Sequence, residues 1–138
     1  MEQLINSITN NNFLIITAWI IFLDSFLGIL RAIKEKQFNS NVGINGAIRK
    51  VAMIGSLAFL AVLDSFFKFN LLFMIPTEWT SALNIQSIGL CDFFAILFIL
   101  FEGVSVLKNM VLCGLPIPTA LQTKLESFLN NMTKELEV

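Results

Sequence analysis

Four acidic side chains lie within or at the edges of the long apolar stretches of this sequence: Asp24, Asp64, Asp92 and Glu102. An ionised acid at the centre of a bilayer costs about 2.5–3.5 kcal/mol on insertion scales. Acids at such depth usually face a protein interior or a water-filled cavity, where they pair with cations or line an ion path. The four residues are therefore candidates for contacts in a pore or between helices.

Asp64 and Asp24 each have a basic residue within reach along the same stretch. Asp64 precedes Lys68 by four residues, which is the favourable order for an ion pair on one helix. A simple local pair and a role in a pore or assembly both remain open for these two residues. Asp24 shares a helical face with Gly28 and Arg31. An ion pair between Asp24 and Arg31 would span a longer distance than the Asp64–Lys68 pair.

Glu102 is the strongest candidate for a buried or pore-facing acid, because no basic residue lies one turn away in its own stretch. The alternative is an interfacial position near Lys108, close to the lipid headgroups. Asp92 is expected near the outer membrane interface, where the cost of a charge is small.

The residues that most catalytic and metal sites need are missing from the sequence. There is no histidine, and Cys91 and Cys113 form no CxxC pair. Neither a Ser–His dyad nor a zinc site or disulfide framework is indicated. The net charge of −1 gives no basic excess for binding nucleic acid. We expect no enzymatic activity, no metal or cofactor, no small-molecule substrate and no nucleic-acid partner.

The stretches that carry the acids are long enough to cross a membrane. Hydrophobic residues make up 56% of the chain and charged residues 14%, whereas soluble domains average about 45–50% and 25%. A hydrocarbon core of ~30 Å needs about 20 apolar residues. The predicted transmembrane helices are residues 13–30, 51–67 and 88–107. Twelve Leu, Ile or Phe residues in the first contribute roughly −4 to −7 kcal/mol, which outweighs Asp24.

Basic residues predict the orientation of these spans. Residues 1–12 contain no Lys or Arg, and residues 68–87 contain a single basic residue, Lys68. By the positive-inside rule, residues 31–50 form a cytoplasmic loop, 108–138 a cytoplasmic tail, and the N-terminus lies outside. The apolar segment 69–75 either lies in the outer interface or extends the second helix. The topology determinants are Arg31, Lys34, Lys36, Arg49 and Lys50.

Small residues spaced four apart predict close helix packing in lipid, within or between chains. These pairs are Gly28 and Ala32, Ala52 and Ser56, and Ala61 and Ser65. Apolar residues at helical spacing between 119 and 136 predict a C-terminal amphipathic helix. The expected fold is an all-α integral membrane protein with three transmembrane helices plus this C-terminal helix.

Several segments resemble the toxin-secretion/phage-lysis holin family between Asp24 and Pro118. They are Leu23–Gly28, Ala32–Lys34, Phe38–Ser40, Gly43–Ile54, Lys68–Asn70, Phe93–Leu100 and Cys113–Pro116. The resemblance implies a non-enzymatic protein of the bacterial cytoplasmic membrane that forms homo-oligomers. These would open lesions that release an endolysin or a toxin, with an antiholin as a further partner besides the lipid bilayer.

Two other functions compete with lesion formation. One is a small channel or transporter subunit whose acids line an ion path. The other is an antiholin-type regulator that binds another membrane protein and opens nothing. The spans show no inverted repeats and no helices broken by Gly or Pro, which favours a holin over a transporter.

Overall fold

Three long helices dominate the computed structural model, which describes residues 5, 9–36, 40–74, 76–82, 85–121, 123, 124 and 127. By length and apolar composition, three helices in this part of the chain qualify as membrane spans. The predicted all-α, three-span fold is confirmed. The elements are α2 (Asn12–Glu35), α3 (Ser40–Phe67), the 3-10 helix η1 (Leu72–Met74), α4 (Thr77–Ala82) and α5 (Leu90–Cys113).

Helix α2 begins and ends with recognisable caps. The Leu14 backbone N–H donates to Asn11 Oδ1 at 2.8 Å, which satisfies a donor of the first turn. At the other end, Lys36 adopts a left-handed conformation with φ 52°, and its N–H returns to carbonyls of the last turn. The buried residues fall at helical spacing along one stripe. They are Thr17, Ile21, Asp24 and Leu27.

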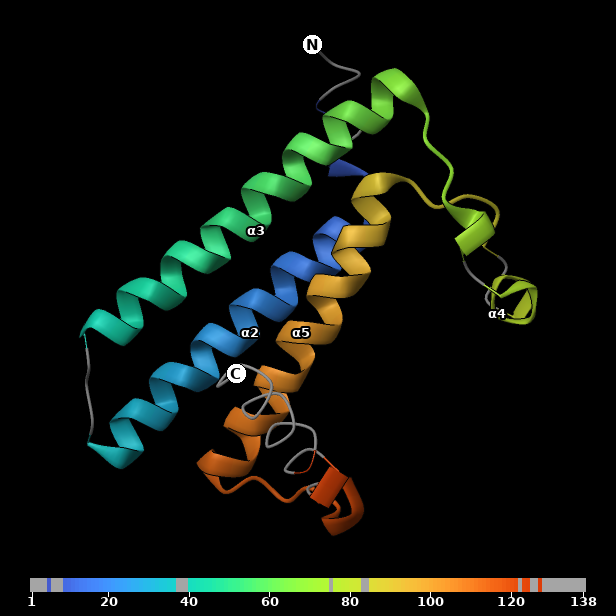
Figure 1. Ribbon diagram of the computed structural model, residues 1–138. Helices are drawn as coiled ribbons and strands as arrows, with labels where there is room; N and C mark the ends of the chain where they lie inside the picture. The colour runs from blue at the N-terminus through green and yellow to red at the C-terminus, as the bar shows by residue number, and fades with distance from the viewer. Residues whose placement is uncertain are drawn as a thin grey trace, which may run out of the picture.

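Helices α2 and α5 run parallel and side by side, as Figure 1 shows. The Thr17 hydroxyl lies 3.5 Å from the Ala95 carbonyl oxygen near one end, and Lys34 Nζ donates to the Leu112 carbonyl at 3.0 Å near the other. Both contacts join residues 78 positions apart, so the two helices keep one register along their length. Asp24 and Glu102 therefore occupy the same level of the bundle.

Helix α3 meets α5 through a small apolar core. Leu57 and Ala61 of α3 pack against Cys91 and Ala95 of α5, and all four are buried. The small side chains let the helix backbones approach closely, as is common in membranes. Ala61 of the predicted Ala61/Ser65 pair therefore packs within the chain, while Ser65 is exposed.

Large apolar side chains cover the outside of the bundle. Trp19 is 67% exposed, Val51 71% and Phe66 68%. A soluble protein rarely leaves so much apolar surface in contact with water. A lipid environment accounts for these exposures, because acyl chains replace the missing core.

The second helix begins much earlier than expected. α3 starts at Ser40 rather than Val51, so Arg49 and Lys50 are helical and do not belong to a loop. It ends at Phe67, and Lys68 has φ 50°, so segment 69–75 does not extend it. The predicted C-terminal amphipathic helix lies largely outside the described residues, although 119–121 are helical.

Asp64, near the end of α3, ties that helix to the beginning of α5. Its Oδ1 accepts the Leu90 N–H at 3.0 Å, and its Oδ2 accepts the Cys91 N–H at 2.7 Å. A carboxylate is stabilised at a helix N-terminus by the free N–H groups and by the helix dipole. Gly89 makes the approach possible, since a Cβ there would overlap the Asp64 carboxylate.

We predict that Gly89→Ala destabilises the protein by about 1–3 kcal/mol, because the added methyl displaces the Asp64 carboxylate. The free energy of unfolding in mixed detergent micelles measures the effect. Gly103→Ala is the matched control, since nothing lies within 4 Å of a Cβ there. It should be neutral or stabilising, because Ala is favoured over Gly by about 0.8–1 kcal/mol in a helix interior. Equal stability changes in the two variants would contradict the prediction.

Candidate functional site

A single ammonium group joins all three long helices inside the bundle. Lys50 Nζ of α3 lies 2.5 Å from Asp24 Oδ2 of α2 and 3.0 Å from Glu102 Oε2 of α5. It also donates to the Ile21 carbonyl oxygen at 3.3 Å. Bonds to charged partners are stronger than neutral ones, so each of these contacts is worth more than an ordinary hydrogen bond.

The two acids occupy equivalent positions in their helices. α2 and α5 have 24 residues each, and Asp24 and Glu102 lie near the middle. With a rise of 1.5 Å per residue, each acid is about 16–18 Å from either helix end. Lys50 lies about as many residues after the α2–α3 connection as Asp24 lies before it. Because α2 and α3 are antiparallel, Lys50 and Asp24 meet at the same level. The ionic contacts therefore lie deep within the predicted membrane region.

Two further side chains complete the group that we call the Lys50 cluster: Asp24, Arg49, Lys50, Glu102 and Asn109. Asn109 Nδ2 donates to Asp24 Oδ1 at 2.9 Å. Arg49 Nη2 lies 3.8 Å from Glu102 Oε1, too far for a hydrogen bond. The Arg49 guanidinium also lies 5.0 Å from the centre of the Phe101 ring, within cation–π range.

Charge balance makes the Lys50 cluster tolerable inside a membrane. With two carboxylates, one ammonium and one guanidinium ionised, its charges sum to zero. Glu102 is fully buried and Asp24 nearly so. Removing one member of a buried ion pair typically costs about 3–5 kcal/mol, because the remaining charge is left without a partner. The arrangement can hold three helices together, and it can release them if its charges find other partners.

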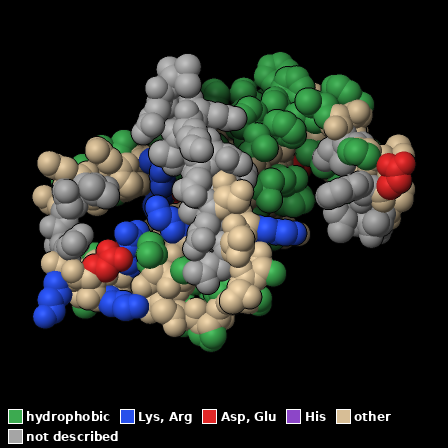
Figure 2. All heavy atoms as spheres, turned by 60° about the horizontal axis from the view of Figure 1, so that its bottom comes forward, with side chains coloured by type: hydrophobic (Ala, Val, Ile, Leu, Met, Phe, Trp, Pro, Cys, Tyr) green, Lys and Arg blue, Asp and Glu red, His purple; other side chains and the backbone are tan. Residues whose placement is uncertain are grey.

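A groove of about 680 Å³ lies between the second half of α2 and the first part of α3, beside the Lys50 cluster. Figure 2 brings this end of the molecule forward and shows Lys and Arg side chains gathered beside a hollow. The small lining residues are Gly28, Ala32, Gly43, Gly46 and Ala47. The charged lining residues are Asp24, Arg31, Glu35, Arg49 and Lys50.

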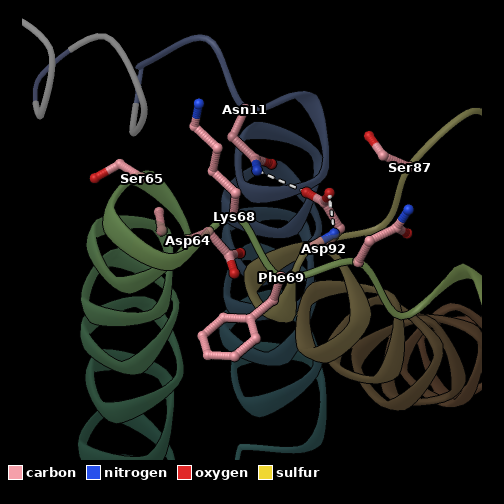
Figure 3. A pocket seen from close by; sticks show the side chains of 10 residues that line it. Asn11, Asp64, Ser65, Lys68, Phe69, Ser87 and Asp92 are labelled. Atoms are coloured by element: carbon pink, nitrogen blue, oxygen red, sulfur yellow. Dashed lines mark hydrogen bonds between the residues drawn. The ribbon is translucent and has the colours of Figure 1, made fainter.

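A smaller polar pocket of about 440 Å³ lies at the opposite end of the bundle. Here Asp92 Oδ1 accepts a hydrogen bond from Asn11 Nδ2 at 2.7 Å, and Asp92 Oδ2 accepts the Gly89 N–H at 3.0 Å. These contacts join the beginnings of α2 and α5. In Figure 3 the Lys68 side chain extends away from the Asp64 carboxylate. Asp64 binds the α5 N-terminus, and no Asp64–Lys68 ion pair is present between these two described residues.

The four acids thus separate into two groups. Asp24 and Glu102 meet in the Lys50 cluster, whereas Asp64 and Asp92 bind backbone N–H groups at the start of α5. Arg31 was considered as a more distant partner for Asp24, but it pairs with Glu35 at 2.9 Å.

The remaining predicted residues lie around the groove. A Cβ on Gly28 would lie 3.8 Å from Asn109 Nδ2, so this glycine faces α5 of its own chain. Ala32 lines the groove. Lys34 contacts the end of α5, and Lys36 caps α2. A role for these positions between copies of the chain remains a prediction.

Sequence reasoning missed Asn109, Asn11 and Gly89 as site residues. Asn109 follows Glu102 by two helical turns and is 7% exposed. The sequence contained a signal that could have identified Asn109, because it is a polar residue on the same helical face as the predicted buried acid Glu102. Asn11 and Gly89 act through helix ends whose spatial neighbours are distant in the sequence.

Comparisons with known proteins identify relatives of this chain. Residues 5–130 match the bacteriophage holin family. The holin-like protein TcdE of Clostridioides difficile is 46% identical over 136 residues, which cover 99% of this chain and 82% of TcdE. An uncharacterized 14.9 kDa protein in the nagH 3′ region of Clostridium perfringens is 31% identical over 111 residues, covering 80% of this chain and 71% of that protein. No solved structure matches the chain. The chain therefore belongs to the bacteriophage holin family.

Proposed function

We propose that this holin assembles in the cytoplasmic membrane into lesions through which an endolysin or a toxin leaves the cell, and that the Lys50 cluster holds the single chain closed beforehand. Membership of the holin family supports the first statement. The observation that carries the second is the bridge from Lys50 to one acid on each neighbouring helix.

The closed bundle offers lipid an apolar exterior and keeps its ionic groups inside. A lesion wide enough for a protein must be lined by polar surface, because water fills it. Asp24, Lys50 and Glu102 are the described groups of α2, α3 and α5 that can supply such a lining at mid-depth. Separating the helices exposes these groups to water, and hydration then replaces the ion pairs.

Charge balance also suggests how opening responds to the membrane potential. A charge that crosses the whole membrane changes in energy by about 2.3 kcal/mol per 100 mV. A neutral cluster that moves as a unit feels little of this field. Once Lys50 separates from Asp24 and Glu102, each charge feels it individually. Collapse of the potential therefore shifts the equilibrium between the closed bundle and the open lesion, whose free energies differ by a few kcal/mol.

The orientation and partners that we propose follow from the sequence. Arg31, Lys34 and Lys36 still lie near the α2–α3 connection, while the connection from α3 to α5 has Lys68 alone. The α2–α3 connection and the tail are then cytoplasmic, and the N-terminus is outside. An antiholin remains a proposed further partner.

Replacing Lys50 by Met tests the closing role of the cluster. The change leaves Asp24 and Glu102 buried without their shared cation, which destabilises the closed bundle by about 3–5 kcal/mol. Permeabilisation, measured as release of a cytosolic enzyme after induction, should begin earlier than in the wild type at equal membrane levels. Lys108→Met is the control, because Lys108 is an exposed cation near the end of α5.

The double variant Lys50→Met, Asp24→Asn restores neutrality, with Arg49 and Glu102 as the remaining ions. Its onset should return toward the wild-type time. The closing role would be refuted if Lys50→Met and Lys108→Met both permeabilised at the wild-type time. It would equally fail if the double variant opened no later than the single one.

Orientation can be measured with two conservative replacements at exposed positions, Ser40→Cys and Ser87→Cys, in a background without other cysteines. Ser40 begins α3, and Ser87 lies in the connection before α5. A membrane-impermeant maleimide should label Cys at 87 in intact cells, and Cys at 40 only after the cells are opened. The reverse pattern would show the opposite orientation, and equal labelling of both would exclude the three-span topology.

A further inference from the structure

The groove between α2 and α3 contains charged side chains at a depth where lipid would not tolerate them. Arg49 lies six residues beyond Gly43, the start of the candidate span, which places it about 9 Å along that helix. Its side chain is nevertheless 49% exposed. An arginine in contact with acyl chains there would be costly, so water or protein must surround it.

A second observation concerns the charged residues that line the groove. Lys50 and Asp24 both line it, and Glu102 lies buried behind them, outside the lining. Glu102 Oε1 has no hydrogen-bond partner among the described residues, and the guanidinium of Arg49, which lines the groove, lies 3.8 Å from it. The groove therefore leads to the cationic side of the Lys50 cluster.

The groove is wide enough for water. Its walls carry glycines and alanines, which leave a volume of about 680 Å³. Water needs polar partners in such a space, and the charged lining residues supply them. Arg31 and Glu35 lie toward the α2–α3 connection, so that end of the groove has a charged rim.

The other end of the groove is closed. No lining residue comes from α2 before Asp24 or from α3 beyond Lys50. Farther along, Leu57 and Ala61 pack against α5 in an apolar core, with Phe13 and Leu14 of α2 beside it. The groove therefore opens toward one membrane face only.

The geometry points to an aqueous half-channel: the α2–α3 groove of a single chain admits water from the membrane face at the α2–α3 connection and conducts it to Arg49 and Lys50. These two cations are thus hydrated from one side before any lesion forms, while Glu102 stays buried behind them. This inference concerns the closed single chain and does not depend on lesion formation.

Thiol accessibility tests the half-channel with two matched pairs of cysteine replacements in a background without other cysteines. Ala47→Cys and Ser25→Cys place a thiol in the groove. Their chain neighbours Ile48 and Phe26, 62% and 50% exposed, are absent from the groove lining and give lipid-facing controls at matched depth. The reagent is a charged methanethiosulfonate, applied to inverted and to right-side-out vesicles before permeabilisation begins.

Both groove thiols should react at least about tenfold faster than their neighbours, because the thiolate is the reactive form and apolar surroundings raise a thiol's pKa. The fast reaction should occur from one face only, the face at which Cys at 40 is labelled. Equal rates within each pair would overturn the half-channel. Labelling by an uncharged maleimide alone would indicate acyl chains in the groove, and oxidative cross-linking between copies at 47 would indicate a second chain. Either result would replace the proposal.

Discussion

Lys50 Nζ holds one carboxylate from α2 and one from α5, and Asn109 and Arg49 make the further contacts to these two acids. The parallel register of α2 and α5 brings Asp24 and Glu102 to one level, and the antiparallel α3 brings Lys50 to the same level. Each acid alone would be costly in lipid, and the shared cation removes most of that cost. Few other contacts join α2 to α3, so the relation of these helices depends strongly on this bridge.

Sequence patterns predicted the three spans and pointed to Glu102 as a buried acid, because both follow from the cost of transferring residues into lipid. The role of Lys50 could not be predicted in this way. It was assigned to a cytoplasmic loop, since the second apolar stretch begins only at Val51 and basic residues mark cytoplasmic loops. Its partners are 26 and 52 residues away in the chain. The position of Lys50 inside the bundle depends on this tertiary pairing, which a local sequence pattern does not record.

Asp64 illustrates a second limit of local reasoning. Its spacing from Lys68 suggested an ion pair on one helix, but two backbone N–H groups at the start of α5 bind it instead. Free N–H groups at a helix N-terminus attract a carboxylate strongly when they are not otherwise satisfied. Gly89 alone leaves the space for this contact. The competition between a lysine and a helix end is decided by the position of a distant segment.

The Asp64–Gly89 contact also determines where the bundle can bend. It fixes the end of α3 to the start of α5, while the first part of α3 lies beside an open groove. α3 has 28 residues and is about 42 Å long, so once the Lys50 cluster separates, α3 would be a lever anchored at its Asp64 end. A tilt of about 10° would move its Ser40 end, about 36 Å from Asp64, by about 6 Å. A small rotation at one membrane face is thereby converted into a large displacement at the other.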